Sequence, residues 1–118
     1  MIVLFDTNML LVPKQFGIDV FSEVDRLVPG NEKATITQVV HELENVNDRR
    51  AANVGLELVK RYALRIIPAT GKADDALIDV AIKERAVVCT NDRELKERCA
   101  EKGIKIIFMR GKKKLEIR

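Results

Sequence analysis

Residues 74–108, DDALIDVAIKERAVVCTNDRELKERCAEKGIKIIF, decide the fold because they alternate two kinds of pattern. A stretch with apolar side chains at helical spacing (74–84) precedes a short, almost wholly apolar run (86–90). A second helical stretch (92–102) and a second apolar run (104–108) follow. Apolar runs without alternation are typical of strands covered on both faces. The alternation of helix and strand predicts right-handed βαβ crossovers and a parallel sheet with helices on both sides.

The same alternation extends towards the N-terminus. Three further apolar runs predict strands, at Ile2–Phe5, Ala34–Ile36 and Leu64–Ile67. Helical periodicity predicts three more helices, at about 19–28, 38–47 and 50–62. No linker, repeat or low-complexity stretch divides the chain. We therefore expect one α/β domain over residues 1–118, with about five strands and with 104–118 as the last strand and a basic tail.

Composition and charge exclude several classes of protein. The 118 residues are 47% apolar, too many for a disordered chain, yet no apolar run approaches the ~18 residues of a membrane helix. Cys89 and Cys99 are too few for a disulfide framework and lie in no metal-ligand spacing. We expect a cytoplasmic protein with free thiols and no membrane partner. The absence of Trp and the single Tyr disfavour an aromatic single-strand binder.

Acidic residues follow the predicted strands. Asp6 comes directly after the first strand, and Glu42 lies in the opening turns of the helix after the second. Asp74 and Asp75 begin the helix after the third strand, and Asp92 follows the fourth. In a parallel α/β sheet, ligands bind beyond the carboxyl ends of the strands. We therefore expect these side chains, remote in sequence, to converge in space.

Such a cluster is costly unless cations neutralise it. Two carboxylates 4 Å apart repel by about 4 kcal/mol at an effective dielectric constant of ~20. Several such pairs would be comparable with the ~5–15 kcal/mol stability of a whole domain. All-oxygen ligands select Mg²⁺ or Mn²⁺ over zinc, and one or two such ions can activate water for attack on a phosphodiester. The pattern therefore predicts a divalent-metal site.

Each acid also has a simpler structural interpretation. Asp6 and Asp92 can cap turns or helices. Glu42 and Glu44 flank opposite sides of one apolar stripe, so periodicity does not choose between them. His41, the single histidine, points away from that stripe, and we expect it to be solvent-exposed. With one histidine, the sequence offers no Ser-His-Asp or Cys-His catalytic arrangement.

Four short motifs together carry a family resemblance. They are FDTN (5–8), VVHEL (39–43), DDALIDVA (74–81) and TNDREL (90–95). Each is common by chance, but all four occur in one order, each after a predicted strand. In order and spacing they resemble the acidic motifs of PIN-domain ribonucleases. The closest likeness is to the ribosomal-RNA-processing PIN proteins of archaea, followed by toxin-type PIN ribonucleases.

The resemblance implies a three-layer α/β/α sandwich and metal-dependent endonucleolytic cleavage of RNA. It also implies that Asp6, Glu42, Asp75 and Asp92 are catalytic and bind one or two Mg²⁺ or Mn²⁺ ions. Asp75 is preferred because it heads the Asp-Ala-Leu-Ile segment that matches the family. For Asp74 the sequence allows three roles: a helix cap, a residue that supports the ligands, or a further metal ligand.

Neighbouring polar residues complete the predicted site. Asn8 and Thr90 can hydrogen-bond the ligand carboxylates, and turn chemistry explains them almost as well. Arg93 and the cluster Lys112, Lys113 and Lys114 are candidates for contact with RNA phosphates.

The expected partners are RNA, a second copy of the chain, and either an antitoxin or a ribosomal precursor particle. The alternative function is a catalytically weak or inactive RNA-binding factor for ribosome assembly on the same fold. All four acids are present, which favours the enzyme. A receiver-like phosphoacceptor domain is disfavoured because the first strand offers one acid instead of a pair.

Overall fold

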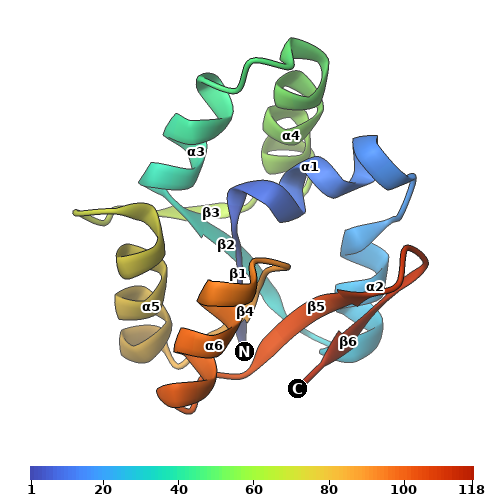
Figure 1. The fold of residues 1–118 in the computed structure, drawn as a ribbon. Coiled ribbons are helices and arrows are strands. Elements are labelled where there is room, and N and C mark those ends of the chain that lie inside the picture. The colour runs from blue at the N-terminus through green and yellow to red at the C-terminus, as the bar shows by residue number, and fades with distance from the viewer.

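The computed structural model describes the backbone of residues 1–118 and every side chain except that of Lys14. The strands are β1 (Ile2–Phe5), β2 (Glu32–Ile36), β3 (Arg65–Ile67), β4 (Val87–Cys89), β5 (Ile106–Arg110) and β6 (Lys114–Ile117). The helices are α1 (Thr7–Phe16), α2 (Val20–Leu27), α3 (Thr37–Glu44), α4 (Arg49–Arg61), α5 (Ala73–Glu84) and α6 (Arg93–Glu101). Figure 1 shows their arrangement around the central sheet. No helix among the described residues is both long and apolar enough to cross a membrane.

The strands form one sheet in the order β3-β2-β1-β4-β5-β6. The first five are parallel, as predicted, and β6 is antiparallel to β5. Right-handed crossovers place α1 to α4 on one face of the sheet and α5 and α6 on the other. Helix α5 accordingly packs across β1, β2 and β4, while α6 packs on β5. The predicted α/β sandwich of three layers is confirmed.

The topology places a binding crevice between β1 and β4. These two strands are neighbours, yet the chain continues from β1 towards β2 on one side and from β4 towards β5 on the other. Ligands of open α/β sheets bind at such a switch point, beyond the carboxyl ends of the strands. The Asp6 N–H donates to the Cys89 carbonyl at 3.3 Å, so the two strand ends stay close.

The core explains why these elements hold together. Val3, Leu4 and Phe5 of β1 are fully buried because helices cover both faces of the sheet. On the α1–α4 face, Phe5 packs against Phe21 of α2 with ring centroids 5.1 Å apart, and Phe21 stacks on Tyr62 at 4.3 Å. Burial of such side chains stabilises the fold by about 1.5–3 kcal/mol each.

A glycine lets two helices of this layer approach closely. A Cβ atom on Gly55 of α4 would lie 2.9 Å from Leu43 Cδ2 and 3.5 Å from the Leu10 carbonyl oxygen. The absence of a side chain at this position therefore lets α4 support both α1 and α3. Those two helices carry the residues that follow β1 and β2.

Helix α1 was not predicted from the sequence. Its residues Met9, Leu10, Leu11 and Val12 are consecutive and all buried, and the helix packs against α2, α3 and α4. A helix buried on several sides lacks the periodic apolar stripe from which amphipathic helices are recognised. The helix ends at Gly17, whose φ of 67° is left-handed and favourable for glycine.

Strand β6 replaces the basic tail expected at the C-terminus. It pairs with β5 from Arg110 to Ile107 and is fixed to α2 by two hydrogen bonds. The Leu115 N–H donates to Glu23 Oε1 at 2.9 Å, and Arg26 Nη2 donates to the Leu115 carbonyl at 2.9 Å. These hydrogen bonds fix the segment in the sheet. Local sequence patterns could not predict it, because its partners Glu23 and Arg26 lie about 90 residues earlier in the chain.

Candidate active site

Asp6 lies at the junction of β1 and α1 and is almost completely buried. It caps α1, because its Oδ1 accepts the Met9 N–H at 2.8 Å. Its Oδ2 accepts a short hydrogen bond from the Thr90 hydroxyl. Burial raises the pKa of Asp6 from 3.8 to about 6, against the lowering effect of these two hydrogen bonds. Nearby Asp74 and Asp92 raise it further.

Thr90 links Asp6 to the helix that follows β4. Besides donating to Asp6, its Oγ1 accepts the Asp92 N–H at 3.0 Å. Asp92 in turn caps α6, with its Oδ1 accepting the Leu95 N–H at 2.8 Å. The carboxylate of Asp92 therefore has a second oxygen that does not serve this cap. Capping and ligand binding are compatible roles for the same side chain.

We expect Thr90→Val to destabilise the protein by about 1–3 kcal/mol, although valine has nearly the same shape. The Thr90 hydroxyl donates to the buried Asp6 carboxylate and accepts the Asp92 N–H, and valine can do neither. Urea unfolding in EDTA measures the change. Thr90→Ser keeps the hydroxyl and serves as the control, with a loss below about 1 kcal/mol. Equal losses in both variants would show that packing, and not the hydroxyl, matters.

The adjacent acids at the start of α5 point in different directions. Asp74 is partly buried and lines the same pocket as Asp6. Burial and the neighbouring carboxylates Asp92, Glu42 and Glu94 raise the pKa of Asp74, while Arg98 opposes the shift.

Asp75 lies outside this pocket and pairs with Arg98 of α6 at 2.7 Å. Consecutive helical residues are separated by about 100° around the helix axis, so one of the two faces the pocket and the other does not. The pocket is therefore lined by Asp74 and not by Asp75, the acid that the sequence resemblance preferred.

Glu42 reaches the pocket from α3. Its Oε2 accepts the Thr7 hydroxyl at 2.7 Å, which joins the first turn of α1 to α3. Asn8 also lines the pocket and is exposed. Glu44 lines a neighbouring hollow together with the exposed His41. Of the two acids that flank the α3 stripe, Glu42 is therefore the one beside Asp6.

These side chains enclose a small pocket of about 50 Å³ at the switch point of the sheet. Its carboxylates come from four different elements and its lining includes Asp6, Glu42, Asp74 and Asp92. The raised pKa values of Asp6 and Asp74 follow partly from the mutual repulsion of these groups. Four acids that are remote in sequence, Asp6, Glu42, Asp74 and Asp92, therefore lie together in this pocket.

The donor chemistry of this pocket fits a hard divalent cation, because every charged group in it is a carboxylate. Among the described side chains, however, no three Asp, Glu, His or Cys residues are arranged to hold one ion. Asp6 bonds to Thr90 and Glu42 bonds to Thr7 instead. Each carboxylate oxygen can accept more than one partner, so these hydrogen bonds leave lone pairs for an ion once the side chains draw closer together.

Comparison with known proteins places this chain in a family. Residues 3–112 match the model of a family described as PIN like domain. The chain belongs to this family. The motifs that suggested the resemblance lie within the matched residues.

Two curated relatives of this PIN domain are ribonucleases. The chain is 30% identical to Ribonuclease VapC4 from Methanocaldococcus jannaschii, over 95% of this chain and 92% of the relative. It is 26% identical to Ribonuclease VapC9 from Archaeoglobus fulgidus, over 93% and 84% respectively. These relatives support a nuclease function for the PIN domain.

Solved structures show the same fold. The PIN domain endonuclease Utp24 superposes with a TM-score of 0.85 and 25% identity, covering 99% of this chain and 90% of Utp24. VapBC2 from Rickettsia felis, solved bound to a DNA fragment from its promoter, matches with a TM-score of 0.60 and 18% identity, covering 83% of this chain and 92% of that one. The second likeness concerns the fold alone.

The predicted basic residues occupy two places in the PIN domain. Arg93 begins α6, directly after Asp92. Lys112 and Lys113 lie in the turn between β5 and β6, and Lys114 begins β6. The Lys112 ammonium lies 5.6 Å from the ring centre of Phe16, at the end of α1 opposite to Asp6. That end is about 15 Å away, given the 1.5 Å rise per residue of a ten-residue helix.

Two residues near the site were missed by sequence reasoning. Thr7 donates to Glu42, and Arg98 pairs with Asp75 while lowering the pKa of Asp74. Thr7 belongs to the FDTN motif, so its position next to Asp6 was a usable signal. Arg98 gave none, because its partner lies 23 residues away on another helix.

Proposed function

We propose that this PIN domain is a metal-dependent endoribonuclease whose catalytic centre is the pocket around Asp6. The observation that carries the proposal is the meeting of four carboxylates, from four separate elements, at the switch point of the sheet. The ribonuclease names of two curated relatives support the choice of RNA as substrate.

In this proposal Asp6, Glu42, Asp74 and Asp92 hold one or two Mg²⁺ or Mn²⁺ ions. Such ions, when bound, supply Lewis-acid activation of water and stabilise the charge that develops on the phosphate. Asp74 takes the place that the family resemblance gave to Asp75, because Asp75 lies outside the pocket and pairs with Arg98.

The chain's own residues supply geometry. The Met9 N–H and the Thr90 hydroxyl hold the two oxygens of Asp6 in fixed directions. Thr90 also fixes the main chain at Asp92, so the carboxylates that follow β1 and β4 keep a constant separation. Preorganisation of this kind lowers the cost of aligning a water molecule with the scissile phosphate. No covalent intermediate with the protein is required.

The test is cleavage of an end-labelled single-stranded RNA. We expect cleavage with Mn²⁺ or Mg²⁺ and none with EDTA, and we expect products with 5′-phosphate and 3′-hydroxyl ends. A DNA oligonucleotide of the same sequence serves as the control for substrate class. A 2′,3′-cyclic phosphate would mean that the ribose hydroxyl is the nucleophile and would contradict the proposal. RNA binding without metal-dependent cleavage would favour the inactive assembly factor.

We expect Mn²⁺ to raise the melting temperature of the protein. Binding to the folded state alone stabilises by RT ln(1 + [L]/Kd), which is about 1.4 kcal/mol at tenfold excess over Kd. For a domain of this size that corresponds to a shift of roughly 5 °C. Asp92→Asn should reduce the shift, whereas Asp48→Asn, a cap on α4, should not. An unchanged melting temperature at millimolar Mn²⁺ would contradict the metal site.

Two biological roles are compatible with this activity. The VapC relatives favour a toxin with an antitoxin partner, and the resemblance of the sequence motifs to ribosomal-RNA-processing PIN proteins favours maturation of ribosomal RNA. Expression in a bacterial host distinguishes them. A toxin should arrest growth in the wild-type form and not as Asp6→Asn, whereas a maturation enzyme should leave growth unchanged and cut precursor RNA at defined positions.

A further inference from the structure

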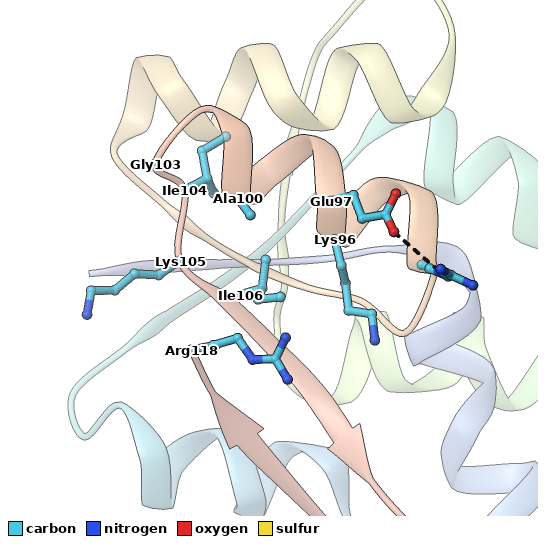
Figure 2. A pocket seen from close by; sticks show the side chains of 9 residues that line it. Lys96, Glu97, Ala100, Gly103, Ile104, Lys105, Ile106 and Arg118 are labelled. Atoms are coloured by element: carbon cyan, nitrogen blue, oxygen red, sulfur yellow. Dashed lines mark hydrogen bonds and ion pairs between the residues drawn. The ribbon is translucent and has the colours of Figure 1, made fainter.

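A groove of about 620 Å³ runs along α6 on the side away from β4 (Figure 2). One wall is α6, and the other is formed by the start of β5 and the end of β6. The residues that line it include Arg93, Lys96, Glu97, Lys105, Ile106 and Arg118. Residues 93, 96, 97 and 100 are spaced so that they form one face of the helix. This face is therefore turned towards the groove.

The charge of the groove is strongly positive. Four cationic side chains line it against a single acidic side chain, that of Glu97. Glu97 is engaged by Arg93 at 3.2 Å, the contact drawn as a dashed line in Figure 2. Among the described side chains, Lys96, Lys105 and Arg118 have no carboxylate partner within 4.0 Å. The groove therefore presents cationic charge that intramolecular ion pairs do not neutralise.

Two of these cations are held over an aromatic ring. Lys96 Nζ lies 5.2 Å from the ring centre of Phe108, and the Arg118 guanidinium carbon lies 4.5 Å from it. Figure 2 shows Lys96 and Arg118 converging from α6 and β6 over the start of β5. Contact with the ring limits the freedom of both side chains, so less entropy is lost when they bind an anion. Ile104 and Ile106 add an apolar floor.

The groove starts beside the carboxylate pocket. Its first residue, Arg93, directly follows Asp92, which lines that pocket. The groove then extends along α6 to Gly103 and Lys105, at the opposite edge of the sheet. A chain with a repeated negative charge, crossing the pocket, would meet this row of cations next. Nucleic-acid backbones have that property along their whole length.

We propose that the α6 groove binds the backbone of the RNA substrate on one side of the scissile phosphate. The choice of RNA rests on the proposed function, whereas the binding of a polyanion rests on the groove itself. Lys96 and Arg118 contact phosphates, Arg93 orients the strand at the entrance, and Lys105 contacts it at the far end. Because these contacts are to the backbone, the groove contributes affinity and not sequence preference.

The experiment compares two double variants in EDTA, where cleavage cannot interfere with binding. Lys96→Gln with Arg118→Gln removes two charges from the groove. Lys60→Gln with Arg61→Gln removes one lysine and one arginine from the exposed last turn of α4, on the other face of the sheet. Fluorescence anisotropy of a labelled single-stranded RNA gives Kd from 25 to 200 mM KCl, and thermal unfolding checks that both variants are folded.

We expect the groove variant to bind RNA at least tenfold more weakly at low salt. The slope of log K against log[salt] should fall by about 1.4, which is two contacts at ~0.7 each, while the α4 variant keeps the wild-type slope. Equal slopes in the two variants would overturn the proposal. So would wild-type RNA binding combined with loss of polyglutamate binding, which assigns the groove to an acidic polypeptide.

The two proposals fail in different ways. Groove-dependent RNA binding without metal-dependent cleavage would refute the ribonuclease and support the groove. Metal-dependent cleavage with equal salt slopes would support the ribonuclease and refute the groove.

Discussion

Asp6→Asn should abolish RNA cleavage, by about 10³-fold or more, and at the same time make the metal-free protein more stable at pH 8. The pKa of Asp6 rises from 3.8 to about 6 on folding because the carboxylate is buried near Asp74 and Asp92. This rise of about two pKa units lowers the free energy of unfolding above pH 6 by about 3 kcal/mol at most. Asparagine avoids this cost and can still accept the Met9 N–H that caps α1.

The pH dependence of this gain has a definite sign. Below about pH 3.8 the carboxyl is protonated in both the folded and the unfolded state, so its ionisation costs nothing. Between about pH 4 and 6 the unfolded state ionises and the folded state does not, so the wild-type protein loses stability as pH rises. Urea unfolding in EDTA should therefore give a difference between variant and wild type that is near zero at pH 3.5 and largest above pH 7.

Asp25→Asn is the matched control. Asp25 is an exposed aspartate whose pKa is lowered by hydrogen bonds from Lys33 and Asn31. Its stabilising effect is present at neutral pH and is lost as pH falls, the opposite of Asp6. This variant should cleave RNA normally and should be slightly less stable than wild type at pH 8. If Asp6→Asn instead unfolded readily at that pH, Asp6 would be a structural residue.

The second large effect separates the adjacent acids of α5. Asp74→Asn should lower kcat for RNA cleavage by about 100-fold, because Asp74 lines the pocket with Asp6 and Asp92. Asp75→Asn should lower it by a few-fold at most. That carboxylate is exposed and pairs with Arg98, so its loss should change stability by less than about 1 kcal/mol. Single-turnover cleavage with saturating Mn²⁺ measures both effects.

Metal binding gives an independent comparison of the same two variants. The increase in melting temperature on addition of Mn²⁺ should be reduced in Asp74→Asn and retained in Asp75→Asn. Arg98, which lies near both acids, is present in both variants, so the two proteins differ only in which carboxylate is removed. The reverse result, with Asp75 required and Asp74 dispensable, would contradict the proposal and show that Asp75 is the metal ligand, as the family motif implies.

The parts of the site that follow strands directly could be predicted from sequence. Asp6 comes immediately after β1, and Asp92 comes within three residues of β4. The end of a parallel strand determines where the next residue lies, so the position of each acid follows once the strand is recognised. The family resemblance also selected Glu42 over Glu44, and the structure places Glu42 in the pocket.

The acids at the beginning of α5 could not be resolved in this way. Asp74 and Asp75 are neighbours in one helical turn, and about 100° of rotation decides which one faces Asp6. That rotation depends on how the buried face of α5 packs across β1, β2 and β4. Arg98, on a different helix, then engages the acid that turns outwards.

By itself the sequence determined the alternation of helices and strands, the parallel sheet and the convergence of acids at its carboxyl edge. These features follow from apolar runs and from residues adjacent to them, which are local properties. The tertiary structure decided that α1 is a helix, that β6 extends the sheet, that Asp74 enters the pocket and that a cationic groove borders α6. Each of these depends on contacts between segments far apart in the chain, and no local pattern encodes such contacts.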